Sequence, residues 1–232
     1  MRLTDLTIIV PTKNERQNIQ GLIQSIPPEA ALVILDASQD DTPDLVMRFR
    51  PRRTTVICSP LKIAAARNLG VRSAATSWLL FSDADVIFAP DYFDRLVKLS
   101  PTDALYGPKL SLDDEAPYYQ KFAHWQERFD RIGIPAVSGS NFLVKSETFY
   151  RLGGFRPDLL VNEDTELGYR LKNHGFEIIF DPRLIVYARD HRRLKHGKLR
   201  KDLHTLARCA LIYTNIWPGL LTGRDWGYWS KR

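Results

Sequence analysis

Two aspartates separated by one residue follow a short apolar run in the first half of the chain. The run Trp78–Phe81 continues as Ser82-Asp83-Ala84-Asp85, and two carboxylates at the end of a buried strand are costly unless a cation joins them. A small number of oxygen ligands suits Mg²⁺ or Mn²⁺, which takes its remaining ligands from water and phosphate. A plain turn also favours Asp, so the position at a strand end is what favours a metal site.

A third acid, Asp36, ends the run Leu32–Leu35, where a carboxylate often accepts a hydrogen bond from a ribose hydroxyl or a base N–H. The first apolar run is followed by Pro11-Thr-Lys-Asn-Glu15, which lacks the glycine patterns of dinucleotide-binding folds and of P-loop proteins. Phosphates bound at this edge must therefore be held by a metal ion and by cationic side chains.

These acids need parallel strands to bring them together, because ligands bind at the carboxyl ends of the strands in an open parallel sheet. Runs predicted to be strands buried on both faces are Leu6–Val10, Leu32–Leu35, Thr55–Ile57, Trp78–Phe81 and Ala104–Tyr106. Helical patterns lie between them at Arg16–Ser25, Pro43–Phe49, Leu61–Ala75 and Asp91–Leu99. The third helix has Leu61, Ala65 and Leu69 on one stripe, with Arg67 off it. The alternation predicts a single α/β domain with a Rossmann-like, mainly parallel sheet and helices on both faces.

After Pro108 the pattern becomes mixed α/β. Ser111–Pro117 is acidic and loop-like, and the helix predicted next, over Tyr118–Arg131, carries Tyr118, Phe122, Trp125 and Phe129. Further predicted elements are a strand at Asn141–Val144, a helix at Glu163–Asn173, and an antiparallel pair formed by Glu177–Phe180 and Leu184–Tyr187. We expect this half to extend the first half's sheet, giving one domain over residues 1–188 with parts 1–110 and 111–188.

Composition places the chain among folded proteins. It has 232 residues, of which 44% are apolar and 26% charged, so disorder as the main state is excluded. The apolar stretch after Met1 is short and ends at Pro11, so it is no targeting segment. Cys58 and Cys209 lack metal-ligand spacing, and a reducing cytoplasm is the simplest setting for them.

The net charge of +6 is concentrated in residues 189–232. That basic amphipathic tail holds eleven Lys or Arg and three acids, hence +8, which leaves −2 for the rest. Its helical stripe of Leu199, Leu203, Leu206, Ala210 and Tyr213 is followed by an apolar stretch too short to span a bilayer, and then by Trp and Tyr. Two explanations stay open: peripheral contact with a membrane, or a helix packed on the sheet with a basic outer face.

A series of motifs resembles family 2 glycosyltransferases of the GT-A fold. The resemblance covers about residues 4–188, and its strength lies in the order and spacing of the motifs. They are Thr7–Glu15, Asp36–Thr42, Ala66–Gly70, Phe81–Asp85, Gly139–Leu143, Leu152–Phe155 and Asn162–Leu171. One motif departs from the family pattern, since Leu35-Asp36-Ala37-Ser38 replaces the frequent Asp-Asp-Gly-Ser and makes the base preference harder to infer.

The resemblance implies a nucleotide-sugar half at residues 1–110 and an acceptor half at residues 111–188. It places Pro11, Thr12, Glu15 and Asp36 around the nucleoside, and Arg67 near the base and diphosphate. Asp85 is then the direct metal ligand, and Asp83 contacts the ribose or metal-bound water.

Asp164 is implied as the general base on the acceptor hydroxyl, with Glu163 beside it, although acids also favour a helix N-terminus for electrostatic reasons. His191 or His196 could complete the metal shell, or both could be solvated imidazoles in a basic arm.

The expected activity is metal-dependent, inverting transfer of a sugar from a UDP- or GDP-sugar to a sugar or lipid-linked acceptor. The expected location is the cytoplasm, either free or at the cytoplasmic face of a membrane. We expect no nucleic-acid partner. Two alternatives remain. One is a metal-dependent nucleotidyltransferase, but Pro11–Glu15 lacks the glycine-rich loop expected of that class. The other is a non-catalytic membrane-surface module that keeps the fold. Intact Asp83, Asp85 and Asp164 argue against the latter.

Overall fold

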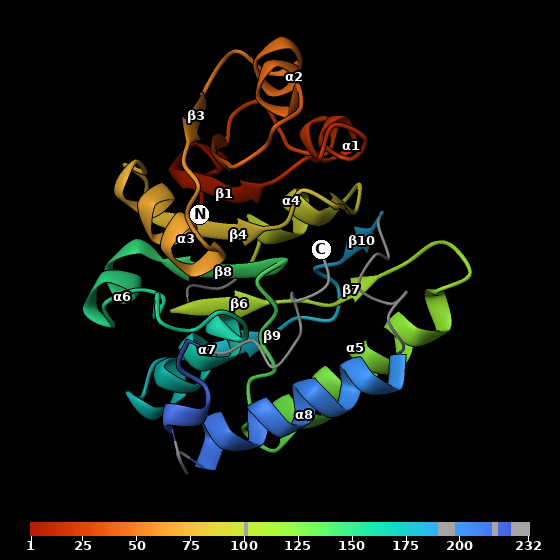
Figure 1. The fold of residues 1–232 in the computed structure, drawn as a ribbon, viewed down its shortest axis with the longest axis vertical. Helices are drawn as coiled ribbons and strands as arrows, with labels where there is room; N and C mark the ends of the chain where they lie inside the picture. The colour runs from red at the N-terminus through yellow and green to blue at the C-terminus, as the bar shows by residue number, and fades with distance from the viewer. Residues whose placement is uncertain (100–101, 190–197, 215–217, 224–232) are drawn as a thin grey trace.

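A seven-stranded sheet lies at the centre of the protein (Figure 1). The computed structural model describes residues 1–99, 102–189, 198–214 and 218–223. Across the sheet the strands are β3 (Thr54–Cys58), β2 (Ala31–Asp36), β1 (Leu6–Thr12), β4 (Trp78–Ser82), β8 (Asn141–Lys145), β6 (Ala104–Tyr106) and β9 (Ile178–Phe180). The first four are mutually parallel, β8 is antiparallel to both its neighbours, and β9 is parallel to β6. The predicted mainly parallel sheet, extended by the second half of the chain, is confirmed.

Helices cover both faces of this sheet, because consecutive residues of a buried strand point to opposite sides. Ile8 of β1 packs in a cluster with α1 (Ile19–Gln24), α2 (Thr42–Phe49) and α4 (Tyr92–Leu96). Ile9 packs on the other face with α3 (Ile63–Arg72), α6 (Ser146–Arg151) and α7 (Glu163–Asn173). Continuous apolar runs in β1, β2 and β4 are the consequence of this double cover.

Two predictions about individual elements are only partly right. In β3, Val56 and Ile57 pack against the two core clusters, but Thr55 and Cys58 are exposed, because β3 is an edge strand with β2 as its partner in the sheet. In α3, Leu69 of the predicted apolar stripe packs against the core, but the ends of the prediction fail. Leu61 precedes the helix and is 42% exposed, whereas Arg67 is 3% exposed, since the ion pairs described below replace its hydration.

The predicted antiparallel hairpin near residue 180 is also wrong. β9 pairs with β6 in the large sheet, while β10 (Val186–Ala188) lies in a second sheet between β5 (Val86–Phe88) and β7 (Lys109–Leu110). β10 overlaps the predicted strand Leu184–Tyr187, so only its pairing differs from the prediction. β5 and β7 have three and two residues, too few for a periodic pattern to reveal them.

The long helices α5 (Ala116–Arg131) and α8 (Lys198–Thr214) lie at the bottom of Figure 1. Tyr118 of α5 donates a hydrogen bond to Asp202 of α8 at 2.8 Å, and α8 packs on α7 through the ring contact of Tyr213 with Tyr169. Its outer face carries Leu203 and Leu206, 59% and 54% exposed. This part of α8 therefore presents apolar side chains outward, and both explanations offered for the tail stay predictions.

Within the described parts of the chain, no helix has both the length and the apolar character needed to cross a membrane.

Gly70 lets α3 approach the sheet closely. A Cβ at this position would lie 2.7 Å from Ile9 Cγ2 and 2.7 Å from Leu35 Cδ2. We predict that Gly70→Ala lowers the free energy of unfolding by about 1–3 kcal/mol through overpacking, despite the higher helix propensity of Ala. Gly21→Ala in α1 is the control, because its Cβ would meet the flexible end of Ile87 at 3.1 Å. Equal unfolding free energies for the two variants in urea would contradict this account.

Candidate active site

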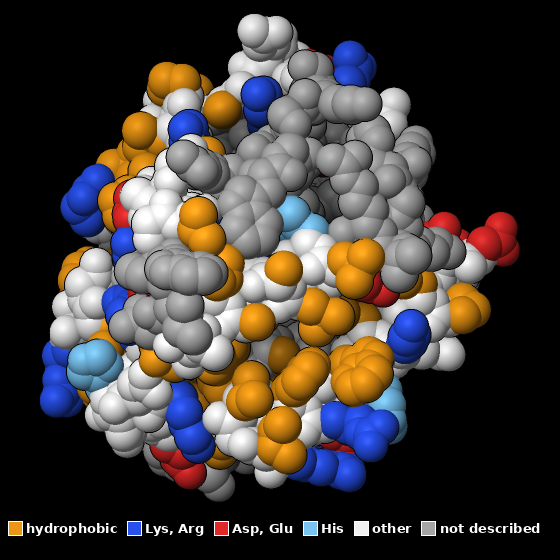
Figure 2. Space-filling view, turned by 60° about the horizontal axis from the view of Figure 1, so that its bottom comes forward, with side chains coloured by type: hydrophobic (Ala, Val, Ile, Leu, Met, Phe, Trp, Pro, Cys, Tyr) orange, Lys and Arg blue, Asp and Glu red, His pale blue; other side chains and the backbone are white. Residues whose placement is uncertain are grey.

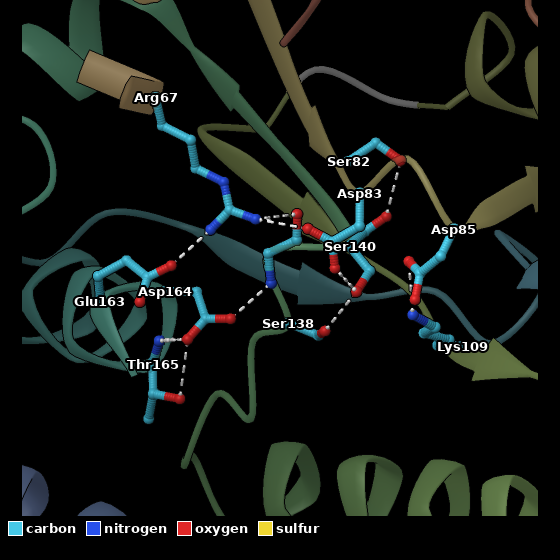
Figure 3. A network of polar contacts seen from close by, with 11 residues as sticks. Arg67, Ser82, Asp83, Asp85, Lys109, Ser138, Ser140, Glu163, Asp164 and Thr165 are labelled. Atoms are coloured by element: carbon cyan, nitrogen blue, oxygen red, sulfur yellow. Dashed lines mark hydrogen bonds and ion pairs between the residues drawn. The ribbon is translucent and has the colours of Figure 1, made fainter. Parts of the chain in front are cut away.

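The site begins where β4 ends at Ser82, one residue before Asp83. Figure 3 shows the side chains around this strand end. Ser82 Oγ donates to the Ser140 carbonyl at 3.1 Å, and Ser140 Oγ donates to Asp83 Oδ2 at 2.7 Å. Asp83 therefore lies at the carboxyl edge of the sheet, held by the loop that precedes β8.

Arg67 of α3 joins both halves of the chain. Its guanidinium contacts Asp83 Oδ1 at 2.9 Å and Glu163 Oε1 at 2.6 Å, and it donates to the Gly139 carbonyl at 3.0 Å. A Cβ at Gly139 would lie 2.4 Å from an Arg67 nitrogen, so a glycine is needed for this approach. A guanidinium this deeply buried requires paired carboxylates, and these come from strand β4 and helix α7.

Glu163 and Asp164 open α7, directly after Asn162 in the left-handed conformation (φ 62°). Asp164 accepts hydrogen bonds from the backbone N–H of Gly139 at 2.6 Å and of Thr165 at 2.7 Å. Asp164 is half-buried, whereas Glu163 is 6% exposed. Two adjacent carboxylates thus have different environments: one is held by backbone amides, and one is buried against a guanidinium.

Glu163 has an altered affinity for protons. Burial, reinforced by the neighbouring Asp164 carboxylate, raises the pKa of Glu163 to about 7, although the Arg67 guanidinium opposes this shift. Desolvation outweighs the ion pair here because the whole carboxyl group is removed from water. Glu163 therefore changes its protonation state near neutral pH.

A polar cavity of about 90 Å³ lies among these groups. Arg67, Asp83, Glu163 and Asp164 line it, together with Ser138–Ser140, Leu160–Asn162, Ile63 and Thr205. Its size suits one hydroxyl-bearing group with a few waters, whereas a whole small-molecule ligand needs about 300 Å³ or more. A larger substrate must extend from this cavity along the sheet edge.

A second group of predicted residues lies at the ends of β1 and β2. Thr12 donates to Asp36 Oδ1 at 2.6 Å, and Ser38 donates to the same oxygen at 2.7 Å. Asp36 is 3% exposed, and the β1–β2 register pairs it with Thr12. Pro11 precedes Thr12 within β1, and Glu15 follows in the next turn, where its backbone N–H donates to Thr42 at 3.0 Å. These residues share the carboxyl edge of the sheet with Asp83.

The third predicted position is Asp85, which pairs with Lys109. Its carboxylate lies 3.3 Å from the ammonium of Lys109, and the two side chains are 20% and 13% exposed. Its remaining lone pairs fit a divalent ion of the Mg²⁺ or Mn²⁺ type, which uses one or two protein carboxylates and completes its shell with phosphate and water. Among the described residues, no cluster of three His, Cys, Asp or Glu could hold a metal by itself. The residues present thus fit an ion bound jointly with a diphosphate. His191 and His196, the other metal-ligand candidates, lie outside the described residues.

Several residues of this site escape a sequence-based search. Gly139 and Ser140 belong to a motif, but their residue types do not indicate a catalytic role. Lys109 comes shortly after the predicted strand Ala104–Tyr106, a common place for a lysine. Arg208 of α8 is fully buried, donating from Nε to Asn162 Oδ1 at 2.9 Å and from its terminal nitrogen to the Val161 carbonyl at 3.1 Å. Its one visible signal is a lone cation inside the apolar stretch Leu206–Ile212.

Comparison with protein-family models identifies the family of this chain. The model described as "Glycosyl transferase family 2" matches residues 7–150, more than half of the chain. The chain belongs to glycosyl transferase family 2. The matched region contains the acids at the strand ends and Arg67, while the Glu163–Asp164 pair lies beyond it.

Curated relatives of this family 2 chain are named for sugar transfer or polysaccharide synthesis. The succinoglycan biosynthesis protein ExoA of Rhizobium meliloti is 27% identical over 208 residues, covering 79% of this chain and 63% of the relative. The pre-mycofactocin glycosyltransferase of Mycobacterium tuberculosis is 24% identical over 210 residues, covering 81% of this chain and 43% of the relative. The chain thus spans less than two thirds of the length of these relatives.

Solved structures show the same fold. The mannosyltransferase PcManGT of Pyrobaculum calidifontis, solved with GDP-Man and Mn²⁺, superposes with a TM-score of 0.68 at 23% identity, covering 88% of this chain and 62% of that one. TarS of S. aureus, residues 1–349 with UDP-GlcNAc, gives 0.66 at 18% identity over 89% of this chain and 66% of that one. The GT-A fold expected from the motifs is confirmed.

The Glu163 pKa predicts how the stability of this family 2 domain depends on pH. Because the pKa of about 7 in the folded state exceeds the ordinary carboxyl value of 4.5, the folded protein binds this proton where the unfolded chain has released it. The Glu163 contribution to the free energy of unfolding is therefore present at low pH and is lost as pH rises towards 7. The slope for one proton is at most about 1.4 kcal/mol per pH unit.

Glu163→Gln should remove this contribution, so the parent-minus-variant difference in unfolding free energy should fall between about pH 4.5 and pH 7 and then level off. Urea unfolding at a series of pH values measures the difference. A constant difference across this window would show that Glu163 does not have the raised pKa.

Proposed function

We propose that the protein is an inverting glycosyltransferase that moves a sugar from a UDP- or GDP-sugar to an acceptor hydroxyl. The observation that carries the proposal is the convergence of Asp83, Arg67, Glu163 and Asp164 on one polar cavity at the carboxyl edge of the sheet. Family membership supports sugar transfer over nucleotidyl transfer and over a non-catalytic surface module. Nucleotide sugars in the PcManGT and TarS complexes support the class of donor.

The donor would bind across the nucleotide-sugar half, residues 1–110. Pro11, Thr12, Glu15 and Asp36 would line the nucleoside end, where Asp36 keeps a carboxylate oxygen for a base N–H beside the hydrogen bonds from Thr12 and Ser38. Asp83 and Asp85 would face the diphosphate end. A divalent ion, Mn²⁺ or Mg²⁺, held by Asp85 and the diphosphate would neutralise charge on the leaving group.

Arg67 would act chiefly by positioning the acids. It is 3% exposed, and its two terminal nitrogens already contact Asp83 and Glu163, so it fixes the distance between the donor side and the acceptor side of the cavity. Its positive charge also lowers the cost of placing Asp83, Glu163 and Asp164 near one another.

Asp164 would be the general base. It faces the cavity, and its Oδ1 accepts from the backbone N–H and the hydroxyl of Thr165. Its Oδ2 accepts from the Gly139 N–H and would take the proton on its second lone pair. An acceptor hydroxyl in the cavity would lose its proton to Asp164 and attack the anomeric carbon from the face opposite the diphosphate. A single displacement of this kind inverts the anomeric configuration. Residues 111–188 would form the acceptor half. Glu163 would orient the catalytic site through its ion pair with Arg67.

Replacement of the base tests the proposal. Asp164→Asn keeps the size of the side chain and one acceptor for the backbone amides but cannot take a proton. We predict that metal-dependent binding of UDP or GDP, measured by calorimetry, stays near the parent value. Turnover of the nucleotide sugar should fall by about 10²–10⁴-fold.

Glu163→Gln is the matched control and should lose less turnover, because Gln still accepts the Arg67 hydrogen bond. A parent protein that binds no nucleotide with Mn²⁺ would refute the donor assignment. An Asp164→Asn variant with parental turnover would place the base elsewhere.

We also propose that the face formed by α5 and α8 contacts an anionic membrane surface. Figure 2 turns this face towards the viewer and shows hydrophobic side chains gathered on it, with Lys and Arg at its edges. Trp125 (45% exposed) and Ile132 (69%) belong to the α5 side, and Leu203 and Leu206 to α8. Apolar groups that enter the headgroup region, surrounded by basic side chains, are typical of interfacial helices.

Charge supports a lipid partner for this α5–α8 face. Arg128 and Arg131 are exposed on α5, and residues 189–232 carry a formal charge of +8. Each Lys or Arg near an anionic leaflet contributes about 1 kcal/mol to binding. Because α8 also supplies Thr205 to the cavity wall, a lipid-linked acceptor could approach the cavity from this side. An anionic leaflet would be that of the cytoplasmic face, the location predicted from the sequence.

Two exposed leucines test the membrane proposal. The double substitution Leu203→Asp and Leu206→Asp should weaken binding to phosphatidylserine-containing vesicles by about tenfold or more, because each buried Leu contributes about 1.5–3 kcal/mol. Met47→Asp on α2, where the side chain is 42% exposed at the far end of the molecule (Figure 1), should leave binding unchanged. Vesicle co-sedimentation measures both. Parental binding by the double variant, or equal binding to neutral vesicles, would refute the assignment.

A further inference from the structure

Lys109 is the cation that pairs with the predicted metal ligand Asp85 within the described part of the chain. Its Nζ lies 3.3 Å from Asp85 Oδ1, longer than the roughly 2.7–2.9 Å of a strong charge-assisted hydrogen bond. Figure 3 shows this pair beside the Arg67 network, with Lys109 reaching Asp85 from a different strand. The ammonium and a divalent ion would therefore use the same carboxylate.

The small second sheet fixes this pair. β10 pairs with β7 at Val186 and Lys109, and with β5 at Ala188 and Val86. The backbone N–H of Arg189 then donates to the Asp85 carbonyl at 2.7 Å. Both members of the pair are thus attached to β10, so their approach is set by backbone hydrogen bonds.

A divalent ion and the Lys109 ammonium cannot share Asp85 without repulsion. An ion on Asp85 Oδ1, at a metal–oxygen distance of about 2.1 Å, would lie at most about 5.4 Å from the ammonium, since Lys109 Nζ is 3.3 Å from the same oxygen. Lys109 is the one that can move, because its charge sits on a flexible four-carbon stem with three donors, and its side chain is partly exposed. The nearest new acceptors would be the diphosphate oxygens that arrive with the nucleotide sugar.

We propose that Lys109 is a counterion that exchanges between Asp85 and the donor diphosphate. This inference rests on the proposed function and deepens it. With Asp85 free of metal, Lys109 neutralises the carboxylate and lowers its affinity for a divalent ion alone. With Asp85 engaged by an ion and a diphosphate, Lys109 donates to the diphosphate and adds a second positive charge to the leaving group. The site therefore favours joint binding of metal and nucleotide over binding of metal alone.

Lys109→Met tests the exchange, because Met keeps much of the stem and removes the charge. Mn²⁺ alone, titrated calorimetrically, should bind the variant about two- to fivefold more tightly, an effect of the size of a partly exposed ion pair. UDP or GDP with saturating Mn²⁺ should bind about tenfold to hundredfold more weakly, because a hydrogen bond to a charged group is lost.

Lys145→Met is a matched control, since Lys145 also lies 3.3 Å from a carboxylate, that of Asp103, away from the site. It should change neither affinity. Lys109→Arg, which keeps the charge, should bind Mn²⁺ within about twofold of the parent, and thermal melting verifies that each variant is folded.

The two binding measurements separate the possible outcomes. Tighter Mn²⁺ binding together with weaker nucleotide binding supports the exchange. Unchanged or weaker Mn²⁺ binding by Lys109→Met overturns it, and so does unchanged nucleotide binding. If the parent itself binds no nucleotide with Mn²⁺, the proposed function fails as well, whereas a normal parent with an unaffected Lys109→Met variant rejects the role of Lys109 alone.

Discussion

The buried guanidinium of Arg67 is the interaction on which the site depends. It connects helix α3 of the first half to Asp83 at the end of β4 and to Glu163 at the start of α7. A charge that is 3% exposed is tolerable only because two carboxylates and a backbone carbonyl replace its water. The positive charge of Arg67 also reduces the repulsion between those carboxylates, so they can lie close together. The relative position of Asp83 and Glu163 is therefore set by one side chain rather than only by the backbone segments that carry the two acids.

The same crowding explains why neighbouring acids differ. Asp164 has two backbone amides directed at its oxygens, whereas Glu163 is buried and has its pKa raised towards neutrality. A buried carboxyl group such as that of Glu163 can hold a proton at a pH where most carboxyl groups have lost it. Gly139 takes part on both sides, since its N–H binds Asp164 and its carbonyl binds Arg67. This backbone position thus links the two acids.

How far the sequence predicts this structure depends on the length of each element. β1, β2 and β4 were predictable because strands buried on both faces give continuous apolar runs, and Asp36, Asp83 and Asp85 follow directly from their strand ends. The strands β5 and β7 are too short for a pattern, and the run that predicts β10 does not reveal these partners, so the Lys109–Asp85 pair could not be foreseen. Arg67 was predicted off the apolar stripe, because helical periodicity cannot represent a buried cation that is paired across the fold. The roles given to all the site residues stay predictions: Asp164 and Glu163 in catalysis, Asp85 and His191 as metal ligands, and Pro11, Thr12, Glu15, Asp36, Arg67 and Asp83 in donor binding.

The contacts of Arg208 indicate that the minimal catalytic unit includes α8. The family match ends at residue 150, yet Arg208 of α8 binds Asn162 and Val161, the two residues that precede Glu163. Asn162 has a positive φ of 62°, a conformation that a non-glycine residue keeps only when its surroundings hold it. The span recognised as the family is thus shorter than the span that folds the acids into place. Truncation before α8 would remove the Arg208 support while retaining every residue named as an acid or a nucleotide contact, which makes this helix an integral part of the enzyme rather than an appendage.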